Sequence, residues 1–168
     1  MFSKATDEWE TPQAFFNELD AEFHFDWDAA ASDENAKCDH YFGGSAVDAL
    51  TANWTEFVLG PIWLNPPYSR CREFIAKAAQ EARRGATVVC LVPSRTDTRM
   101  WHEHVWDAEN NAPRPGVEIR FIKGRLKFGN ATNSAPFPSV VLIFRPHAEV
   151  NAVATDAESD GADRVRKV

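Results

Sequence analysis

A strand, a loop, a helix and a second strand follow one another between residues 62 and 92, and this succession constrains the fold most. Residues 62–64 predict a short strand, and residues 71–84 place apolar side chains on one face of a helix. Gly85 stands where a helix commonly ends, and the β-branched run 86–92 predicts a buried strand. The unit predicts an α/β fold with a doubly wound, mostly parallel sheet, whose binding site lies at the carboxyl ends of the strands.

The rest of the chain supplies further elements around this unit. Residues 13–23 predict an amphipathic helix, and residues 23–28 alternate as a strand does before the small residues 29–32. Two later strands are joined by residues 123–138, which predict a hairpin or a substrate loop. These strands are residues 118–122 and 139–144, and a shorter strand at Tyr41 and Phe42 precedes a turn at Gly43 and Gly44.

The length of the chain allows one well-buried core. With 168 residues, of which 44% are hydrophobic, we expect a minimal single catalytic domain over residues 1–146. Residues 147–168 lack apolar periodicity and predict a disordered acidic tail with a basic end. The chain shows no run long enough to span a membrane and no secretion signal, and its three cysteines and its pair His102 and His104 lack metal-ligand spacing. We therefore expect a cytoplasmic protein that neither binds a membrane nor holds a metal ion.

Charge is distributed unevenly along the chain. Residues 1–69 carry 13 acidic and 2 basic side chains, whereas residues 70–127 carry 7 acidic and 12 basic ones. The first part suits a cationic ligand and the second a phosphate backbone, in spite of the net charge of -7. The alternative is that both parts only present solvated charged faces.

The tetrapeptide Asn65-Pro66-Pro67-Tyr68 follows the first strand of the unit and predicts a catalytic loop. The exocyclic amine of adenine is a poor nucleophile because its lone pair is delocalised into the ring. The side-chain oxygen of Asn65 and the backbone carbonyl of Pro66 would accept its two hydrogens and draw the lone pair onto nitrogen. The prolines fix φ, and the Tyr68 ring offers stacking worth ~1–3 kcal/mol to an extruded base. An ordinary rigid turn is the alternative.

Several other short motifs occur in order along the chain. Residues 28–32, Asp-Ala-Ala-Ala-Ser, are similar to an Asp-Pro-Ala-Ala-Ser signature, with Ala29 in place of the proline. Other pieces are residues 8–12, 35–38, 63–68, 92–98, 101–102, 124–129 and 135–139. Over residues 8–144 the chain thereby resembles the small phage and prophage DNA N6-adenine methyltransferases, the Dam-like phage type.

The resemblance implies an S-adenosylmethionine-dependent methyltransferase of Rossmann-like fold. Such an enzyme flips adenine out of double-stranded DNA and transfers the methyl group directly to N6, commonly within short palindromes such as GATC. The resemblance gives the catalytic role to Asn65, Pro66, Pro67 and Tyr68, and implies no particular oligomeric state. The S-adenosylmethionine site would contain Trp9, Thr11, Pro12, Asp28, Ala30 and Ser32. Asp48 is a further candidate, as an acceptor for the adenine amine of this molecule, and the alternative is a solvated loop aspartate.

Four basic residues are candidates for contact with DNA phosphates. Arg95 and Arg99 follow the strand that ends at Pro93, and Arg125 and Lys127 lie in the long link. The alternative is that all four are surface charges.

Two rival functions remain open. Asn-Pro-Pro-Tyr loops also serve methyl transfer to other planar amines or amides, such as cytosine N4 or glutamine in proteins. The second rival is a DNA-binding module that kept the fold and lost turnover. The intact loop at residues 65–68 favours an enzyme over that module.

Overall fold

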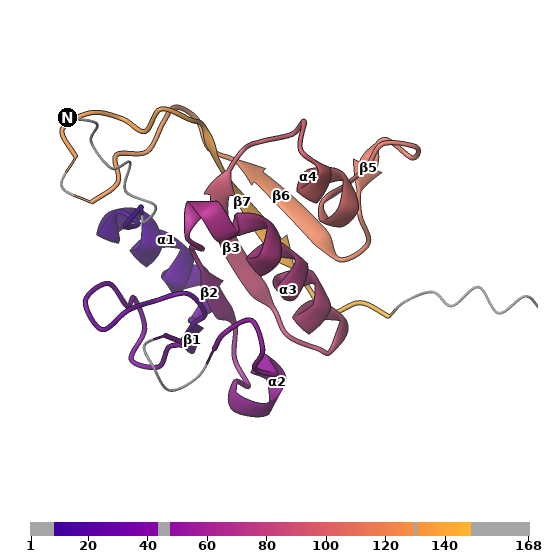
Figure 1. Ribbon diagram of the computed structural model, residues 1–168, viewed down its shortest axis with the longest axis horizontal. Coiled ribbons are helices and arrows are strands. Elements are labelled where there is room, and N and C mark those ends of the chain that lie inside the picture. Colours follow the sequence, from indigo (N-terminus) through magenta and orange to yellow (C-terminus); the bar gives the residue numbers. More distant parts are fainter. Residues whose placement is uncertain (1–8, 44–47, 130, 149–168) are drawn as a thin grey trace, which may run out of the picture.

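The computed structural model describes residues 9–43, 48–129 and 131–148. These residues form a five-stranded mixed sheet in the order β1-β2-β3-β7-β6, a separate two-stranded hairpin, and helices (Figure 1). The helices are α1 (Gln13–Phe23), α2 (Trp54–Phe57), α3 (Cys71–Arg83) and α4 (Arg99–His104), with a 3-10 turn η1 (Tyr68–Arg70). The strands are β1 (Trp27–Asp28), β2 (Ile62–Leu64), β3 (Val88–Pro93), β4 (Trp106–Asp107), β5 (Ala112–Pro113), β6 (Val117–Phe121) and β7 (Ser139–Phe144).

The strand directions bring the segments that hold most of the candidate site residues to one edge of the sheet. Strand β2 pairs in parallel with β1 and β3, whereas β7 runs antiparallel to both β3 and β6. The carboxyl ends of β1, β2, β3 and β6 therefore share an edge, which we call the carboxyl edge. The segments that leave these strands at the carboxyl edge start at residues 29, 65, 94 and 122.

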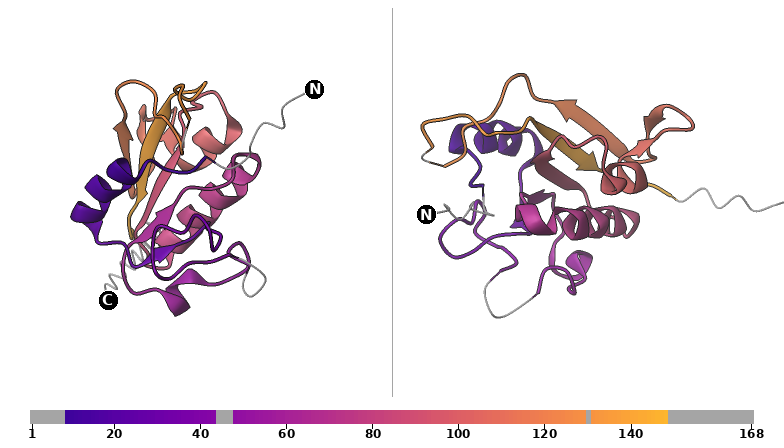
Figure 2. Two further views of the ribbon diagram at one scale, coloured as in Figure 1. Left: turned by 90° about the vertical axis from the view of Figure 1, so that its left-hand side faces the viewer. Right: turned by 45° about the horizontal axis from the view of Figure 1, so that its top comes forward.

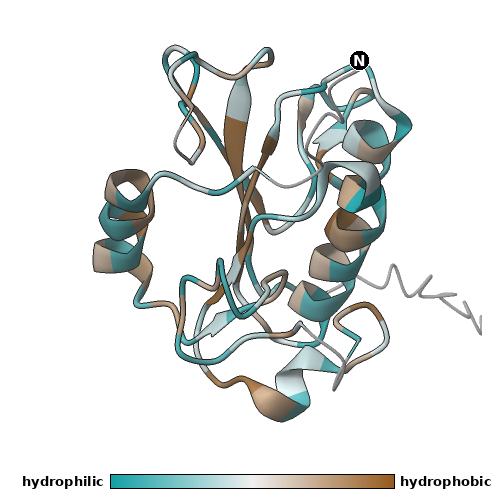
Figure 3. Cartoon of the chain, turned by 60° about the vertical axis from the view of Figure 1, so that its left-hand side comes forward, coloured by the Kyte–Doolittle hydropathy of each residue, from teal (hydrophilic) through white to brown (hydrophobic). Residues whose placement is uncertain are grey.

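Side chains of the central strands alternate between two buried layers, as a sheet covered on both faces requires. In β2, Ile62 and Leu64 belong to one layer and Trp63 to the other. The first layer holds the apolar faces of α2, α3 and α4, and the second holds α1 together with residues of the 122–138 segment. Hydrophobic strands with helices on either side are visible in Figure 3, and Figure 2 gives two further views of the same layers.

The predicted strand, loop, helix and strand unit is confirmed. Helix α3 buries Phe74, Ile75 and Ala78 against the sheet, as the helical spacing predicts. Gly85 ends the helix with φ +113°, a left-handed conformation that costs glycine little, and its N–H donates to the Ala82 carbonyl. The polypeptide then enters β3, of which Val88 to Val92 are buried.

The expected strand over residues 23–28 is wrong in its first half. Phe23 is the last residue of α1, and His24, at φ 55°, ends that helix in a left-handed conformation. The Asp20 side chain then accepts a hydrogen bond from Phe25 N–H, so only Trp27 and Asp28 pair with β2. Phe23 fits both the helical and the alternating pattern, and in the structure it belongs to the helix.

The remaining strands and turns agree only in part with those expected from the sequence. The strand at Tyr41 and Phe42 is reduced to an isolated bridge between Tyr41 and Asp28, and Gly44 of the expected turn lies outside the described residues. Strands β6 and β7 pair antiparallel around the long link, so the link joins a hairpin, one of the two forms expected for it. The small hairpin of β4 and β5 is an addition to the predicted elements.

The α/β class is confirmed, and the sheet is mixed because β7 runs against its two neighbours while the other four strands share one direction. The tail from residue 149 lies outside the described residues. In the described part of the chain, no helix combines the length and the apolar character needed to cross a bilayer.

Candidate active site

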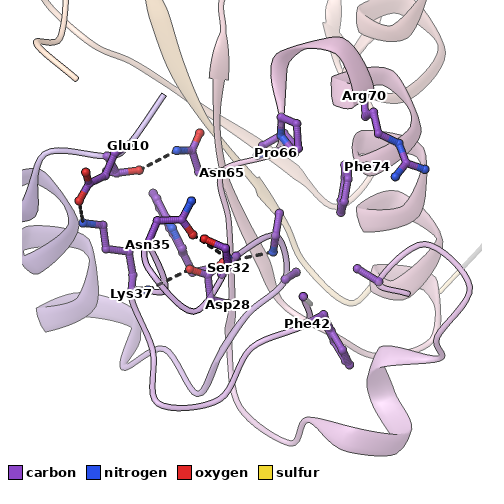
Figure 4. A pocket seen from close by; sticks show the side chains of 18 of the residues that line it. Glu10, Asp28, Ser32, Asn35, Lys37, Phe42, Asn65, Pro66, Arg70 and Phe74 are labelled. Carbon is purple, nitrogen blue, oxygen red and sulfur yellow. Dashed lines mark hydrogen bonds and ion pairs between the residues drawn. The ribbon is translucent and has the colours of Figure 1, made fainter. Parts of the chain in front are cut away.

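A cavity of about 740 Å³ opens at the carboxyl edge, beyond the ends of β1 and β2. This is within the usual size range of small-molecule sites, roughly 300–1,000 Å³. Glu10 and Asn65 lie on one side of the cavity, and Arg70 and Phe74 lie on the other (Figure 4). Of the residues expected at the methyl donor or the catalytic loop, nine line the cavity: Trp9, Thr11, Asp28, Ala30, Ser32, Asp48, Asn65, Pro66 and Pro67.

Two expected residues do not line this cavity. Pro12 is the residue before the first turn of α1, where its fixed φ suits the entry into a helix. Tyr68 begins η1, and its ring packs against Phe137 with centroids 5.5 Å apart.

Asp28 is the most buried carboxylate of the cavity, with 3% of its surface exposed. Its two oxygens accept hydrogen bonds from the backbone N–H groups of Ala30, at 3.2 Å, and Lys37, at 3.1 Å. Burial raises the pKa of the Asp28 carboxyl to about 6, against the lowering effect of these two hydrogen bonds and of the Lys37 charge. Asp28 thus shapes the loop of small residues and carries a charge that a cationic ligand would stabilise.

The loop of small residues is held close to the segment that follows it. Ala31 N–H donates to the Phe42 carbonyl, and Phe42 N–H donates to the Asp28 carbonyl. A side chain at Gly43 would bring its Cβ within 1.8 Å of the Ala31 carbonyl oxygen, so this approach requires glycine. The backbone of residues 28–31 therefore forms a tight wall of the cavity.

Asn65 follows directly on the end of β2 and is anchored through its amide nitrogen. Asn65 Nδ2 donates to the Trp9 carbonyl oxygen at 2.5 Å and to Thr11 Oγ1 at 3.0 Å. A backbone carbonyl only accepts hydrogen bonds, so the nitrogen must be the atom that faces Trp9. In Figure 4 the nitrogen points to the N-terminal segment and Oδ1 points away from it. No described residue donates to Oδ1, which remains available as an acceptor.

The carbonyl groups of the two prolines after Asn65 differ in their hydrogen bonding. The Pro67 carbonyl accepts a hydrogen bond from Arg70 N–H at 3.0 Å, which closes the 3-10 turn. Within the described residues the Pro66 carbonyl has no backbone hydrogen-bond donor. Asn65 Oδ1 and the Pro66 carbonyl are thus two acceptors on adjacent residues to which no residue of the described ranges donates.

The Tyr68 ring does not offer an open surface in this structure. The Arg95 guanidinium lies over the ring at 4.9 Å from its centroid, and Phe137 packs against it. The Tyr68 hydroxyl is buried and has no hydrogen-bond partner among the residues that the structure describes. A base that stacks on the Arg95 side of Tyr68 must first displace the guanidinium.

The N-terminal segment, residues 9–12, joins the cavity to the long link between β6 and β7. Trp9 packs edge-on against Phe128 and Phe137, with ring centroids 5.6 and 5.3 Å apart. The Glu10 carbonyl accepts a hydrogen bond from Gly129 N–H at 2.9 Å. The link therefore lies beside the catalytic loop at the carboxyl edge.

Charged residues of both signs line the cavity, with acidic ones in excess. The acidic residues are Glu10, Asp28, Glu34 and Asp48, and the basic ones are Lys37 and Arg70. The sequence argument did not single out Glu10, Glu34, Lys37 or Arg70. Lys37 Nζ contacts Glu10 Oε1 at 3.3 Å and Gln13 Oε1 at 3.1 Å, a long-range pairing that no local spacing indicates.

The basic candidates for DNA contact differ in their surroundings. Arg125 and Lys127 are exposed on the long link and have no ion pair with any described residue. Arg95 is also exposed, and covers Tyr68. Arg99, by contrast, is paired with Glu103 one helical turn later in α4. Three of the four candidates are thus free of carboxylate partners in the described structure and lie at the carboxyl edge.

None of the three cysteines is poised as a nucleophile. Burial raises the pKa of the Cys71 thiol to about 11 and that of Cys38 to about 12, and it also raises the pKa of the fully buried Cys90 well above its usual value. All three are therefore protonated at neutral pH. Across the described ranges, no cluster of three or more His, Cys, Asp or Glu side chains is placed to bind a metal ion.

Comparison with known proteins agrees with the family resemblance that the motifs carry. The profile of the family described as DNA N-6-adenine-methyltransferase (Dam) matches residues 2–166. A DNA N-6-adenine-methyltransferase of Escherichia phage T1 is 28% identical over 154 residues, which cover 83% of this chain and 63% of the relative. One of Haemophilus phage HP1 is 28% identical over 145 residues, 84% of this chain and 80% of the relative. The chain belongs to the DNA N-6-adenine-methyltransferase (Dam) family.

Proposed function

We propose that this protein transfers a methyl group from S-adenosylmethionine to N6 of adenine in double-stranded DNA. The observation that carries the proposal is the anchoring of Asn65, whose amide nitrogen is tied to Trp9 and Thr11 while its Oδ1 remains an available acceptor. Family membership and the names of the two phage relatives support the same activity. The mixed sheet with helices on both faces is compatible with a doubly wound, Rossmann-like methyltransferase fold.

The cavity fits the methyl donor in size and charge. S-adenosylmethionine carries a sulfonium, an ammonium and a carboxylate, and the cavity offers four acidic and two basic side chains. Asp28 and Asp48 are suited to its cationic or hydrogen-bond-donating groups, and Lys37 and Arg70 to its carboxylate. When bound, this molecule supplies an electrophilic methyl group on sulfur.

The catalytic loop would prepare the adenine amine for attack. Asn65 Oδ1 and the Pro66 carbonyl each accept one N6 hydrogen, so that the nitrogen becomes tetrahedral and its lone pair points away from the ring. Because Asn65 is held before substrate arrives, little reorganisation is needed at the moment of reaction. Two acceptors fit a primary amine with two hydrogens, which applies equally to cytosine N4.

The basic link would contact the DNA backbone. Arg125 and Lys127 are exposed beside the cavity and have no carboxylate partner among the described residues, so they can neutralise phosphates without breaking an ion pair. Arg95 would leave Tyr68 when the extruded base arrives, and the Tyr68 ring would then stack on that base.

The proposal is tested by methyl transfer from labelled S-adenosylmethionine to unmethylated duplex DNA. We expect transfer by the wild-type protein and a loss of about 10²–10³ in kcat for Asn65→Ala, because the variant lacks an acceptor needed mainly in the transition state. Calorimetry should show nearly unchanged affinity for S-adenosylmethionine.

The control is Asn53→Ala, a change at the start of α2 outside the lining of the cavity. Equal turnover by wild type and Asn65→Ala would remove Asn65 from the mechanism. DNA binding without any transfer by the wild type would favour the inactive DNA-binding module.

A further inference from the structure

The hydrogen bonds of Asn65 reach across 54 and 56 positions in the sequence to the N-terminal segment. One acceptor is the Trp9 carbonyl, which belongs to the backbone and is present whatever side chain occupies that position. The other is Thr11 Oγ1, which depends on the identity of residue 11. Thr11 is thus the one side chain of the described structure that holds the Asn65 amide.

Thr11 is itself fixed in position. It is 2% exposed and immediately precedes Pro12 and helix α1. Trp9 packs against Phe128 and Phe137, and the Glu10 carbonyl binds Gly129 N–H, so the segment is held on its other side too. A hydroxyl on a rigid, buried support is suited to orient a neighbouring amide.

The orientation matters because the two ends of the amide have opposite chemistry. With Nδ2 toward Thr11, Oδ1 is presented as an acceptor, whereas an amide turned by 180° would present N–H groups and repel an amine. The Trp9 carbonyl, which only accepts, decides that Nδ2 faces the N-terminal segment. We propose that Thr11 is a positioning residue, whose hydroxyl gives Nδ2 a second acceptor and thereby restrains the Asn65 amide so that Oδ1 meets the substrate amine. This rests on the proposed function for its substrate, and it replaces the expected direct contact of Thr11 with the methyl donor.

The alternative, a methyl-donor contact, predicts a different kinetic effect. Loss of a contact to the methyl donor raises the KM and Kd for S-adenosylmethionine, whereas loss of amide positioning lowers kcat at unchanged affinity. The isosteric Thr11→Val removes the hydroxyl alone, and Thr11→Ser keeps it. Thr55→Val is a matched control, because that half-buried hydroxyl bonds Asn53 Oδ1 and lies outside the cavity.

The experiment combines steady-state kinetics with NMR of the side-chain amide of Asn65, assigned by its absence in Asn65→Ala. For Thr11→Val we expect kcat to fall about tenfold. The KM for DNA and the Kd for S-adenosylmethionine should stay within twofold, and hydrogen exchange of the amide should accelerate. Thr11→Ser should recover most of the wild-type kcat and most of the protection of the Asn65 amide from exchange. Thr55→Val should match the wild type in both measurements.

Three results would overturn the inference. One is unchanged amide exchange in Thr11→Val, and another is faster exchange with unchanged kcat. The third is a tenfold rise in the Kd for S-adenosylmethionine at constant kcat, which would return Thr11 to the methyl-donor site. If the wild type transfers no methyl group, the proposed function fails, while the exchange measurement still decides whether Thr11 holds the amide.

Discussion

Replacement of Asp28 by asparagine should stabilise the protein in the absence of ligand while weakening the binding of the methyl donor. The Asp28 carboxyl is 3% exposed, and burial raises its pKa from 3.8 to about 6. A carboxyl whose pKa is higher in the folded state holds its proton more tightly there. Its contribution to stability is therefore complete below pH 3.8 and declines as the pH rises through about 6.

The size of the effect follows from the shift. Each pKa unit corresponds to about 1.4 kcal/mol, so ionisation of Asp28 costs the folded state about 3 kcal/mol at pH 7.5. Asparagine carries no charge, but it keeps only one of the two acceptors that bind the Ala30 and Lys37 N–H groups, a loss of about 1–1.5 kcal/mol. The net gain in the free energy of unfolding is about 1–2 kcal/mol, which raises Tm by roughly 2–8 °C for a chain of this size.

Thermal unfolding of wild type and Asp28→Asn at pH 7.5 and pH 4 measures this gain. The variant should melt higher at pH 7.5 and slightly lower at pH 4, where the wild-type carboxyl is protonated in the folded state and only the lost acceptor distinguishes the two proteins. The exposed Asp39→Asn is the matched control and should show no such pattern. Calorimetry at pH 7.5 should show at least tenfold weaker binding of S-adenosylmethionine to Asp28→Asn. A variant that is less stable than wild type by the same amount at both pH values would refute the reasoning.

Two further predictions concern the DNA side of the site. The double change Arg125→Ala and Lys127→Ala should weaken DNA binding and reduce the slope of log K against log salt by about 2. The control Arg145→Ala, at the opposite edge of the sheet, should leave the slope unchanged. Fluorescence anisotropy across a salt series measures the slope, and an unaltered slope in the double variant would show that the two residues do not contact DNA phosphates. Tyr68→Phe should retain methyl transfer and raise the free energy of unfolding by up to ~1 kcal/mol in urea titrations, because it removes a buried hydroxyl that no described residue binds. A clear loss of turnover would show that the hydroxyl takes part in the reaction.

The sequence predicts the elements that depend on local pattern. Helix α3, its terminal Gly85 and strands β2, β3 and β7 follow from periodicity over short stretches. The strand at residues 23–28 is predicted too long because a left-handed His24 is invisible in the pattern. The position of β7 between β3 and β6 depends on pairing between distant segments, so local pattern does not supply it.

In the candidate site too, some features follow from the local sequence and others depend on contacts between distant segments. The positions of Asn65, Pro66 and Asp28 at the cavity are predictable because each lies at or just after the end of a predicted strand, whereas the catalytic role of Asn65 and Pro66 stays a prediction. The contacts of Asn65 with Thr11, and of Lys37 with Glu10, join residues far apart in the chain, and only the fold reveals them. The ion pair of Arg99 with Glu103 has the four-residue spacing of a helix and was open to prediction from the sequence.

The identity of the methylated nucleoside tests the central claim most directly. Duplex DNA incubated with the wild-type protein and S-adenosylmethionine is digested, and the nucleosides are separated and identified by mass spectrometry. The account predicts N6-methyladenine, absent from a parallel reaction with Asn65→Ala. N4-methylcytosine as the product, or N6-methyladenine formed equally well without the Asn65 side chain, would contradict it.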